Sequence, residues 1–296
     1  MSSTNGTKEQ NLSGQHQQGK SPPPGYPPPG YLPYGHPYYN TSMVPTSDSP
    51  AYRPGRQQQE SFEDEERFGI SFSEKHVRAA FVRKVYTIIT LQLLWTTAVC
   101  AVFMFIGLPM FLIQNFFIVY ILLGVFFALA MVITCFQTLR RKSPINIILL
   151  AAFTIVMSLI VGIMTAFHDV LSVLLALGST VIVCTIIILF ACQTKYDITG
   201  CGPLLLVLGI AVMTYCLIVL ILNIFYRYDK ILHLVGAGLS TGLFSLYLMY
   251  DTQMIMGGRR IEISPEEHIL AALQIYLDII NIFLNLLTIF GITRRL

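Results

Sequence analysis

The chain has 296 residues, of which 54% are hydrophobic and only 12% carry a charge, and its formal net charge is +3. A soluble globular domain typically has about 25% charged residues, so this composition excludes a soluble globular protein and indicates a polytopic membrane protein. The sequence has no basic patch interleaved with aromatic residues, so we do not expect nucleic acid as a partner.

The polar residues are concentrated in a tail that precedes the apolar sequence. Residues 22–31 read PPPGYPPPGY, a tandem five-residue repeat. Proline fixes φ and removes a hydrogen-bond donor, which favours a solvated polyproline II backbone over a packed core. We therefore expect residues 1–75 to form a disordered, Pro/Tyr-rich tail in the cytosol, and residues 76–296 to form the membrane domain.

The repeat holds two copies of the Pro-Pro-x-Tyr pattern that WW domains bind. A segment that is already extended as polyproline II docks on an aromatic groove at low entropic cost. The pattern predicts binding to WW domains of the type found in ubiquitin ligases, and chance matches in a low-complexity tail are the alternative. The motif residues are Pro23, Pro24, Tyr26, Pro28, Pro29 and Tyr31.

Seven apolar segments follow the tail, each close to the ~20 residues that cross a bilayer as a helix. Short polar or proline-containing connections separate most of them. We therefore expect an all-α membrane protein with seven transmembrane helices. The predicted spans cover residues 85–106, 115–138, 145–167, 171–192, 203–226, 231–254 and 269–290.

The distribution of lysine and arginine orients these spans, because cytosolic loops carry an excess of both. This bias places the N-terminus in the cytosol. Arg294 and Arg295 fall on the opposite side, which would suit six spans and a re-entrant last segment. Residues 269–290 nevertheless reach about 33 Å as a helix, enough to cross a bilayer, and we predict seven spans. The cytosolic charges are Lys75, Arg78, Arg83, Lys84, Arg140, Arg141, Lys142, Lys195, Arg259 and Arg260.

Two aspartates, Asp251 and Asp278, lie inside the sixth and seventh predicted spans. A charged residue at the centre of a span costs about 2.5 to 3.5 kcal/mol on insertion scales, and such residues mark ion pathways and proton relays. In an antiparallel hairpin both aspartates lie in the cytosolic half, at depths that differ by less than one helical turn. We therefore expect the two carboxyl groups to meet directly or through a shared water.

Two carboxylates in contact at low dielectric cannot both ionise cheaply, so we expect the pair to titrate in two coupled steps. With one step near cytosolic pH, Asp251 and Asp278 would form a pH-sensitive latch. Protonated, they would hold the two spans together; deprotonated, they would repel and offer oxygen ligands that suit Ca²⁺. The pattern predicts transient Ca²⁺ binding along an ion pathway, without a cofactor. The alternative is that each aspartate caps or pairs locally.

Other polar residues near the last two spans have two interpretations. Asn281 and Asn285 follow Asp278 on about the same helix face, so they either line the pathway or form hydrogen bonds between helices. The run of residues 140–142, Arg-Arg-Lys, either sets topology or supplies an arginine that reaches an aspartate.

Four segments resemble the transmembrane Bax inhibitor motif family, and its lifeguard branch in particular. They are VRAAFVRKVYTIITLQLL (77–94), RRKSPINIILL (140–150), SLYLMYDTQMIMGG (245–258) and ISPEEHILAALQIYLDIINIFLNLLTIFG (263–291). The resemblance implies six helices around a central seventh, and a pH-controlled calcium leak channel of internal membranes that suppresses cell death. It also implies a location in Golgi, endoplasmic reticulum, endosome or lysosome, with apoptosis regulators as candidate partners.

The two pore aspartates of that family correspond to Asp251, in YDTQ, and Asp278, in YLDIINIF. The resemblance also implies an arginine that pairs with the aspartates in a closed form. That arginine maps onto Arg140, although a shift of one residue would place Leu139 there.

Two other functions compete with the channel. A membrane adaptor would use the spans as an anchor and the tail to recruit ubiquitin ligases. An intramembrane aspartyl protease would use two aspartates as general acid and base, but its Gly-x-Gly-Asp motif is replaced here by Ile-Tyr-Leu at 275–277 before Asp278. We therefore do not expect an enzyme.

Overall fold

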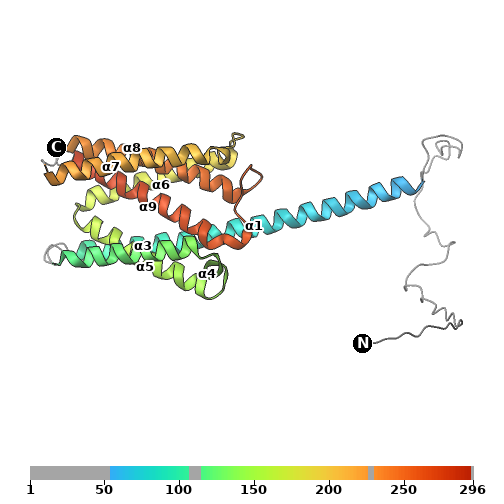
Figure 1. Ribbon diagram of the computed structural model, residues 1–296, viewed down its shortest axis with the longest axis horizontal. Coiled ribbons are helices and arrows are strands. Elements are labelled where there is room, and N and C mark those ends of the chain that lie inside the picture. The colour runs from blue at the N-terminus through green and yellow to red at the C-terminus, as the bar shows by residue number, and fades with distance from the viewer. Residues whose placement is uncertain (1–53, 107–114, 226–229, 295–296) are drawn as a thin grey trace, which may run out of the picture. The chain divides into compact units, whose positions relative to one another are not determined.

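The computed structural model describes residues 54–106, 115–225 and 230–294. The chain separates into two units, Met1–Glu60 and Ser61–Leu296, and the helices below belong to the second apart from the start of the first helix. Within the described residues the regular structure is entirely helical (Figure 1). The α-helices are α1 (Pro54–Phe105), α3 (Phe116–Cys135), α4 (Gln137–Arg141), α5 (Ile145–Ala166), α6 (Val170–Gln193), α7 (Gly202–Phe225), α8 (Lys230–Met256) and α9 (His268–Thr293).

Seven of these described helices are long and apolar enough to cross a membrane. This confirms the predicted all-α fold and the number of spans. The short helix α4 and two 3₁₀ turns, η2 (Thr199–Cys201) and η3 (Pro265–Glu267), lie in the connections.

The first helix differs from the sequence prediction at its start. We expected residues 54–75 in the disordered tail, but α1 already begins at Pro54 and continues to Phe105. Proline suits the first position of a helix, and the glutamine, glutamate and arginine residues that follow are good helix formers. Extending an existing helix also avoids the cost of a new nucleus. Residues 1–53, with the WW-ligand motif, lie outside the described residues.

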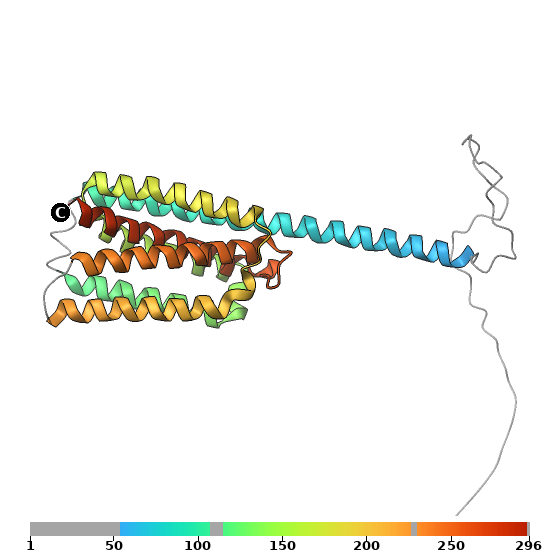
Figure 2. The same cartoon turned by 90° about the horizontal axis from the view of Figure 1, so that it is seen from above.

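Helix α9 packs against α4, α5, α6 and α8, and both views show it beside α8 (Figures 1 and 2). A hydrogen bond of 2.8 Å between the hydroxyls of Thr96 and Tyr276 joins it to α1. Its residues enter both hydrophobic clusters of the described core, for example Tyr276 in one and Ile275 in the other. The arrangement of six helices around a central seventh stays a prediction.

The C-terminal end of α9 is tied to the connection between α5 and α6. Asp169 caps α6, because its carboxylate accepts hydrogen bonds from the amide of Ser172 at 3.1 Å and from its hydroxyl at 2.7 Å. The same carboxylate forms an ion pair with Arg294. Arg294, whose charge conflicted with the predicted orientation, therefore has an acidic partner at its own end of the bundle.

Candidate functional site

The two aspartates lie on neighbouring helices, Asp251 one turn before the end of α8 and Asp278 in the first half of α9. Both are buried, with exposed fractions of 5% and 6%. Their carboxyl groups lie within hydrogen-bonding range of each other. Because two ionised carboxylates in such contact repel strongly, the arrangement favours a shared proton.

The surroundings of the pair are mostly apolar, with a few polar groups. Cys184 of α6 and Tyr247 of α8 lie within electrostatic range of Asp278. One carboxyl oxygen of Asp278, Oδ2, is buried and has no hydrogen-bond partner among the described residues. A buried oxygen of this kind is costly, and a proton, a water or a cation would satisfy it.

Polar residues continue along one face of α9. Gln274, Asp278, Asn281 and Asn285 follow one another at intervals of four and three residues, the spacing of one helix face. Asn281 donates its amide hydrogen to the carbonyl of Leu277, and Asn285 to that of Asn281, both at 2.8 Å. Each amide oxygen is left as an acceptor. Gln274 was not among the predicted site residues, although its spacing of four residues from Asp278 could have revealed it.

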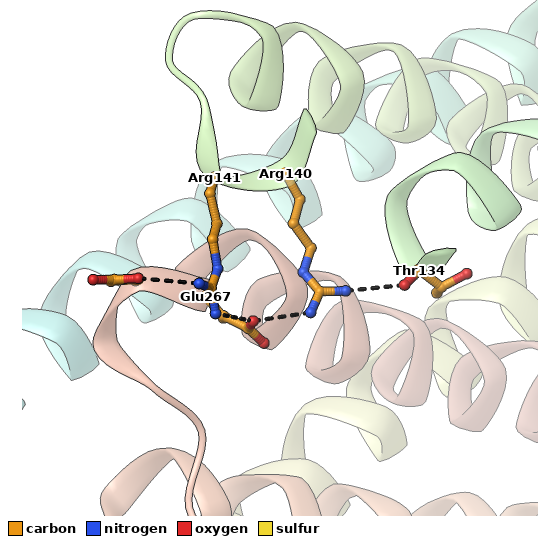
Figure 3. Close-up of polar contacts among 5 residues, drawn as sticks. Thr134, Arg140, Arg141 and Glu267 are labelled. Atoms are coloured by element: carbon orange, nitrogen blue, oxygen red, sulfur yellow. Dashed lines mark hydrogen bonds and ion pairs between the residues drawn. The ribbon is translucent and has the colours of Figure 1, made fainter. Parts of the chain in front are cut away.

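Arg140 is buried, with an exposed fraction of 6%, at the end of α4. Its guanidinium donates to Glu267 at 2.9 Å and to the carbonyl of Thr134 at 3.0 Å (Figure 3). Arg141 donates to the same oxygen of Glu267 at 2.7 Å and pairs with Glu266 at 3.4 Å. The acidic partner of Arg140 is thus Glu267, at the start of α9, and the role of Arg140 beside the aspartates stays a prediction.

Gln253, two residues after Asp251, fixes the connection between α6 and α7. It is fully buried, donates to the carbonyl of Tyr196 at 2.9 Å and accepts from the amide of Ile198 at 2.9 Å. The glutamine of the YDTQ motif therefore holds a loop against the end of α8. Sequence reasoning singled out the aspartate of this motif and missed the glutamine.

The loop after α8 is tied to two other elements. Arg78 of α1 pairs with Glu262 and donates to the carbonyl of Ile263 at 2.8 Å. Gly257 has a φ of +76°, and a Cβ there would lie 2.6 Å from Nε of Arg78. The positive φ favours glycine at 257, and a larger residue there would also require the Arg78 side chain to shift.

Asp197 joins the same loop to the connection between α6 and α7. Its carboxylate accepts from the hydroxyl of Thr199 at 2.6 Å and from the amide of Arg260 at 2.9 Å. These hydrogen bonds, with that of Thr199 the strongest, hold the pKa of the Asp197 carboxyl below its usual value. The two connections thus form one hydrogen-bonded layer beside the end of α8.

The described residues contain no group of three or more His, Cys, Asp or Glu side chains that could hold a metal ion. Asp251 and Asp278 therefore offer two carboxyl groups and no third ligand of these types. Such a pair suits a transient encounter with a hard cation, since Ca²⁺ usually takes six to eight oxygen ligands in a site that retains it.

The helices and the buried acidic pair define a polytopic, all-helical membrane protein with ionisable side chains inside the bundle. Residues 78–295 match the family described as "Inhibitor of apoptosis-promoting Bax1". The chain belongs to this Bax inhibitor family, which confirms the resemblance that the sequence indicated.

Curated relatives are members of the lifeguard group. The chain is 39% identical to human Protein lifeguard 3 over 261 residues, which cover 86% of this chain and 82% of that protein. It is 37% identical to mouse Protein lifeguard 3 over 78% of this chain and 76% of that protein. Identity to mouse Protein lifeguard 4 is 37%, over 77% of this chain and 92% of that protein.

Proposed function

We propose that this protein is a pH-sensitive calcium leak channel of internal membranes, gated by the pair of Asp251 and Asp278. The observation that carries the proposal is that two carboxyl groups on successive membrane helices are both buried and lie within interaction range of each other. Residues this costly inside a membrane domain are retained for ion or proton pathways in most cases.

The chemistry of the pair supplies a gate. With one proton shared, a hydrogen bond joins α8 and α9 and the site carries little negative charge. Loss of that proton leaves two carboxylates that repel each other and attract a cation. The partnerless oxygen of Asp278 is the atom that we expect to meet the ion first.

Besides its ion pair with Glu267, Arg140 has a proposed role in closing the channel. Here it pairs with Glu267, and a rearrangement of α4 against α9 would free its guanidinium for the carboxylates. In that closed form the arginine would repel cations from the pair, as the family resemblance implies.

The membership of the Bax inhibitor family supports a role in suppressing apoptosis. A calcium leak from Golgi, endoplasmic reticulum, endosome or lysosome would lower the calcium store available for death signalling. We propose apoptosis regulators as partners on the same grounds, and a cytosolic N-terminus from the charge bias of the loops.

The decisive experiment measures calcium flux into liposomes that hold the purified full-length protein, across pH 5.5 to 8. Wild-type flux should change with pH, and Asp278→Asn should remove that dependence because only one titrating partner is left. The matched control is Asp169→Asn, an exposed aspartate outside the spans. An unchanged pH profile in Asp278→Asn would contradict the latch, and absence of flux in the wild type would contradict the channel.

The tandem Pro-Pro-x-Tyr motif favours a second function, recruitment of WW-domain ubiquitin ligases to the membrane. Both tyrosines would insert into aromatic grooves, so Tyr26→Ala together with Tyr31→Ala should abolish binding of a purified WW domain to the full-length protein. Tyr34→Ala with Tyr38→Ala is the matched control, since neither of these tyrosines completes the motif. Binding that survives the first pair of changes would reject the adaptor function.

A further inference from the structure

A cavity lined by both polar and apolar side chains lies along α9, beyond Asp278. It has a volume of about 350 Å³ and lies between α7, α8 and α9. Gly236 and Ala237 of α8 form part of its wall, and a Cβ at 236 would lie 3.0 Å from the ring of Tyr215. The polar side chains that line it are Tyr215, Cys216, His233, Ser240, Asn285 and Thr288.

Three polar side chains of the cavity have donated their hydrogens to main-chain carbonyls. The hydroxyl of Tyr215 donates to Leu232 at 3.0 Å, that of Thr288 to Leu284 at 2.9 Å, and the amide of Asn285 to Asn281 at 2.8 Å. Each of the three keeps an oxygen that can accept a hydrogen bond or meet a cation, and Asn285 also keeps its second amide hydrogen. These three oxygens on the wall can accept hydrogen bonds from water and can approach a cation.

Helix α9 carries both Asp278 and two residues of the cavity wall, Asn285 and Thr288. Asn285 follows Asp278 by seven residues, a rise of about 10 Å along the helix. Asn281 lies between them on the same face, and its amide oxygen is also left as an acceptor. Oxygen acceptors thus follow one line from the cavity to the carboxyl groups.

We propose that this cavity is a hydrated vestibule in which neutral oxygens hold a partly hydrated metal cation before it reaches Asp251 and Asp278. The inference rests on the proposed channel function and adds a binding site to it. Neutral oxygen ligands bind Ca²⁺ more weakly than carboxylates, because affinity rises with the number of ligand charges. Weak binding suits a site that must release the ion to the next one.

The first test removes two oxygen acceptors of the cavity wall and replaces them by apolar side chains of similar shape. Asn285→Leu combined with Thr288→Val should raise the calcium concentration for half-maximal flux at least threefold, while the pH dependence of flux stays as in the wild type. Thr214→Val is the matched control, since the Thr214 hydroxyl donates to Ile210 in the same way at 2.8 Å but on an exposed face. An unchanged half-maximal concentration in the double variant would overturn the vestibule.

The second test does not depend on calcium flux. Cys216 lines the cavity, so a variant that keeps it as the sole cysteine reports whether water and ions enter. A cationic methanethiosulfonate reagent should modify Cys216 several times faster than an anionic reagent of similar size, after correction for their rates with free cysteine. Equal rates, or no reaction with either reagent, would overturn the vestibule.

The two tests separate this inference from the function on which it rests. Wild-type flux with an unreactive Cys216 would overturn the vestibule and leave the channel standing. A wild type without flux would overturn the channel, and with it the delivery of ions from the cavity.

Discussion

Arg140 at the end of α4 and Glu267 at the start of α9 form an ion pair of 2.9 Å, and their side chains are only 7% and 14% exposed. The pair joins the helix that bears Asp278 to the α3–α5 side of the bundle. Arg140 also donates to Thr134, the penultimate residue of α3. The start of α9, eleven residues before Asp278, is therefore held to this side of the bundle by a buried charge contact.

Breaking this ion pair should destabilise the protein strongly. Glu267→Gln leaves the buried guanidinium of Arg140 without its counter-charge, a loss of about 3 kcal/mol in the free energy of unfolding. Thermal unfolding of the purified protein in detergent would measure it. The control is Arg141→Ala, which removes a more exposed contact to the same carboxylate and should cost much less. Equal losses in the two variants would show that the burial of Arg140 is unimportant.

Gln253→Leu should loosen the connection between α6 and α7. The change removes both hydrogen bonds of Gln253 and leaves the amide of Ile198 and the carbonyl of Tyr196 unsatisfied, at a cost of about 1 to 3 kcal/mol. Hydrogen exchange of residues 194–199 should become faster. Gln137→Leu, at an exposed position, is the control, and protection that persists in Gln253→Leu would contradict the clamp.

The two aspartates should behave as one unit in a double-mutant cycle. Asp251→Asn and Asp278→Asn each remove the repulsion between the carboxylates, so the second change should add little to the first. We expect a coupling energy of about 0.5 to 3 kcal/mol in thermal unfolding at neutral pH. Additive effects would mean that the carboxyl groups do not interact in the folded protein.

Acid should weaken the layer held by Asp197. Its pKa lies below the usual value of 3.8 because the folded state donates hydrogen bonds to the carboxylate. The contribution of Asp197 to stability is therefore full above the unfolded pKa and is lost as the pH falls through the lower, folded pKa. Thermal unfolding between pH 6 and 3 would follow this loss.

The corresponding variant removes the titrating group. Asp197→Asn should be less stable than the wild type at pH 6, and the difference should shrink as the pH approaches 3. Glu266→Gln is the control, because Glu266 is more exposed, with only a long contact to Arg141. A difference between Asp197→Asn and the wild type that stays constant with pH would reject this assignment.

The helical class, the seven spans and the family were all accessible from the sequence. The helical class and the spans follow from the length of the apolar runs, and the family follows from the YDTQ and YLDIINIF motifs. The beginning of α1 was not accessible, because a polar run of good helix formers is compatible with either a tail or a helix extension.

Most contacts between side chains that are distant in the sequence could not be predicted from the sequence. The sequence placed Asp251 and Asp278 on adjacent arms of a hairpin, since each arm fixes the depth of its residue. It did not pair Arg140 with Glu267, or Gln253 with residues 196 and 198, because these partners come from connections whose course depends on how several helices pack. The cavity beside Asn285 is likewise a product of tertiary structure, because only the assembly of α7, α8 and α9 brings its oxygens to one space.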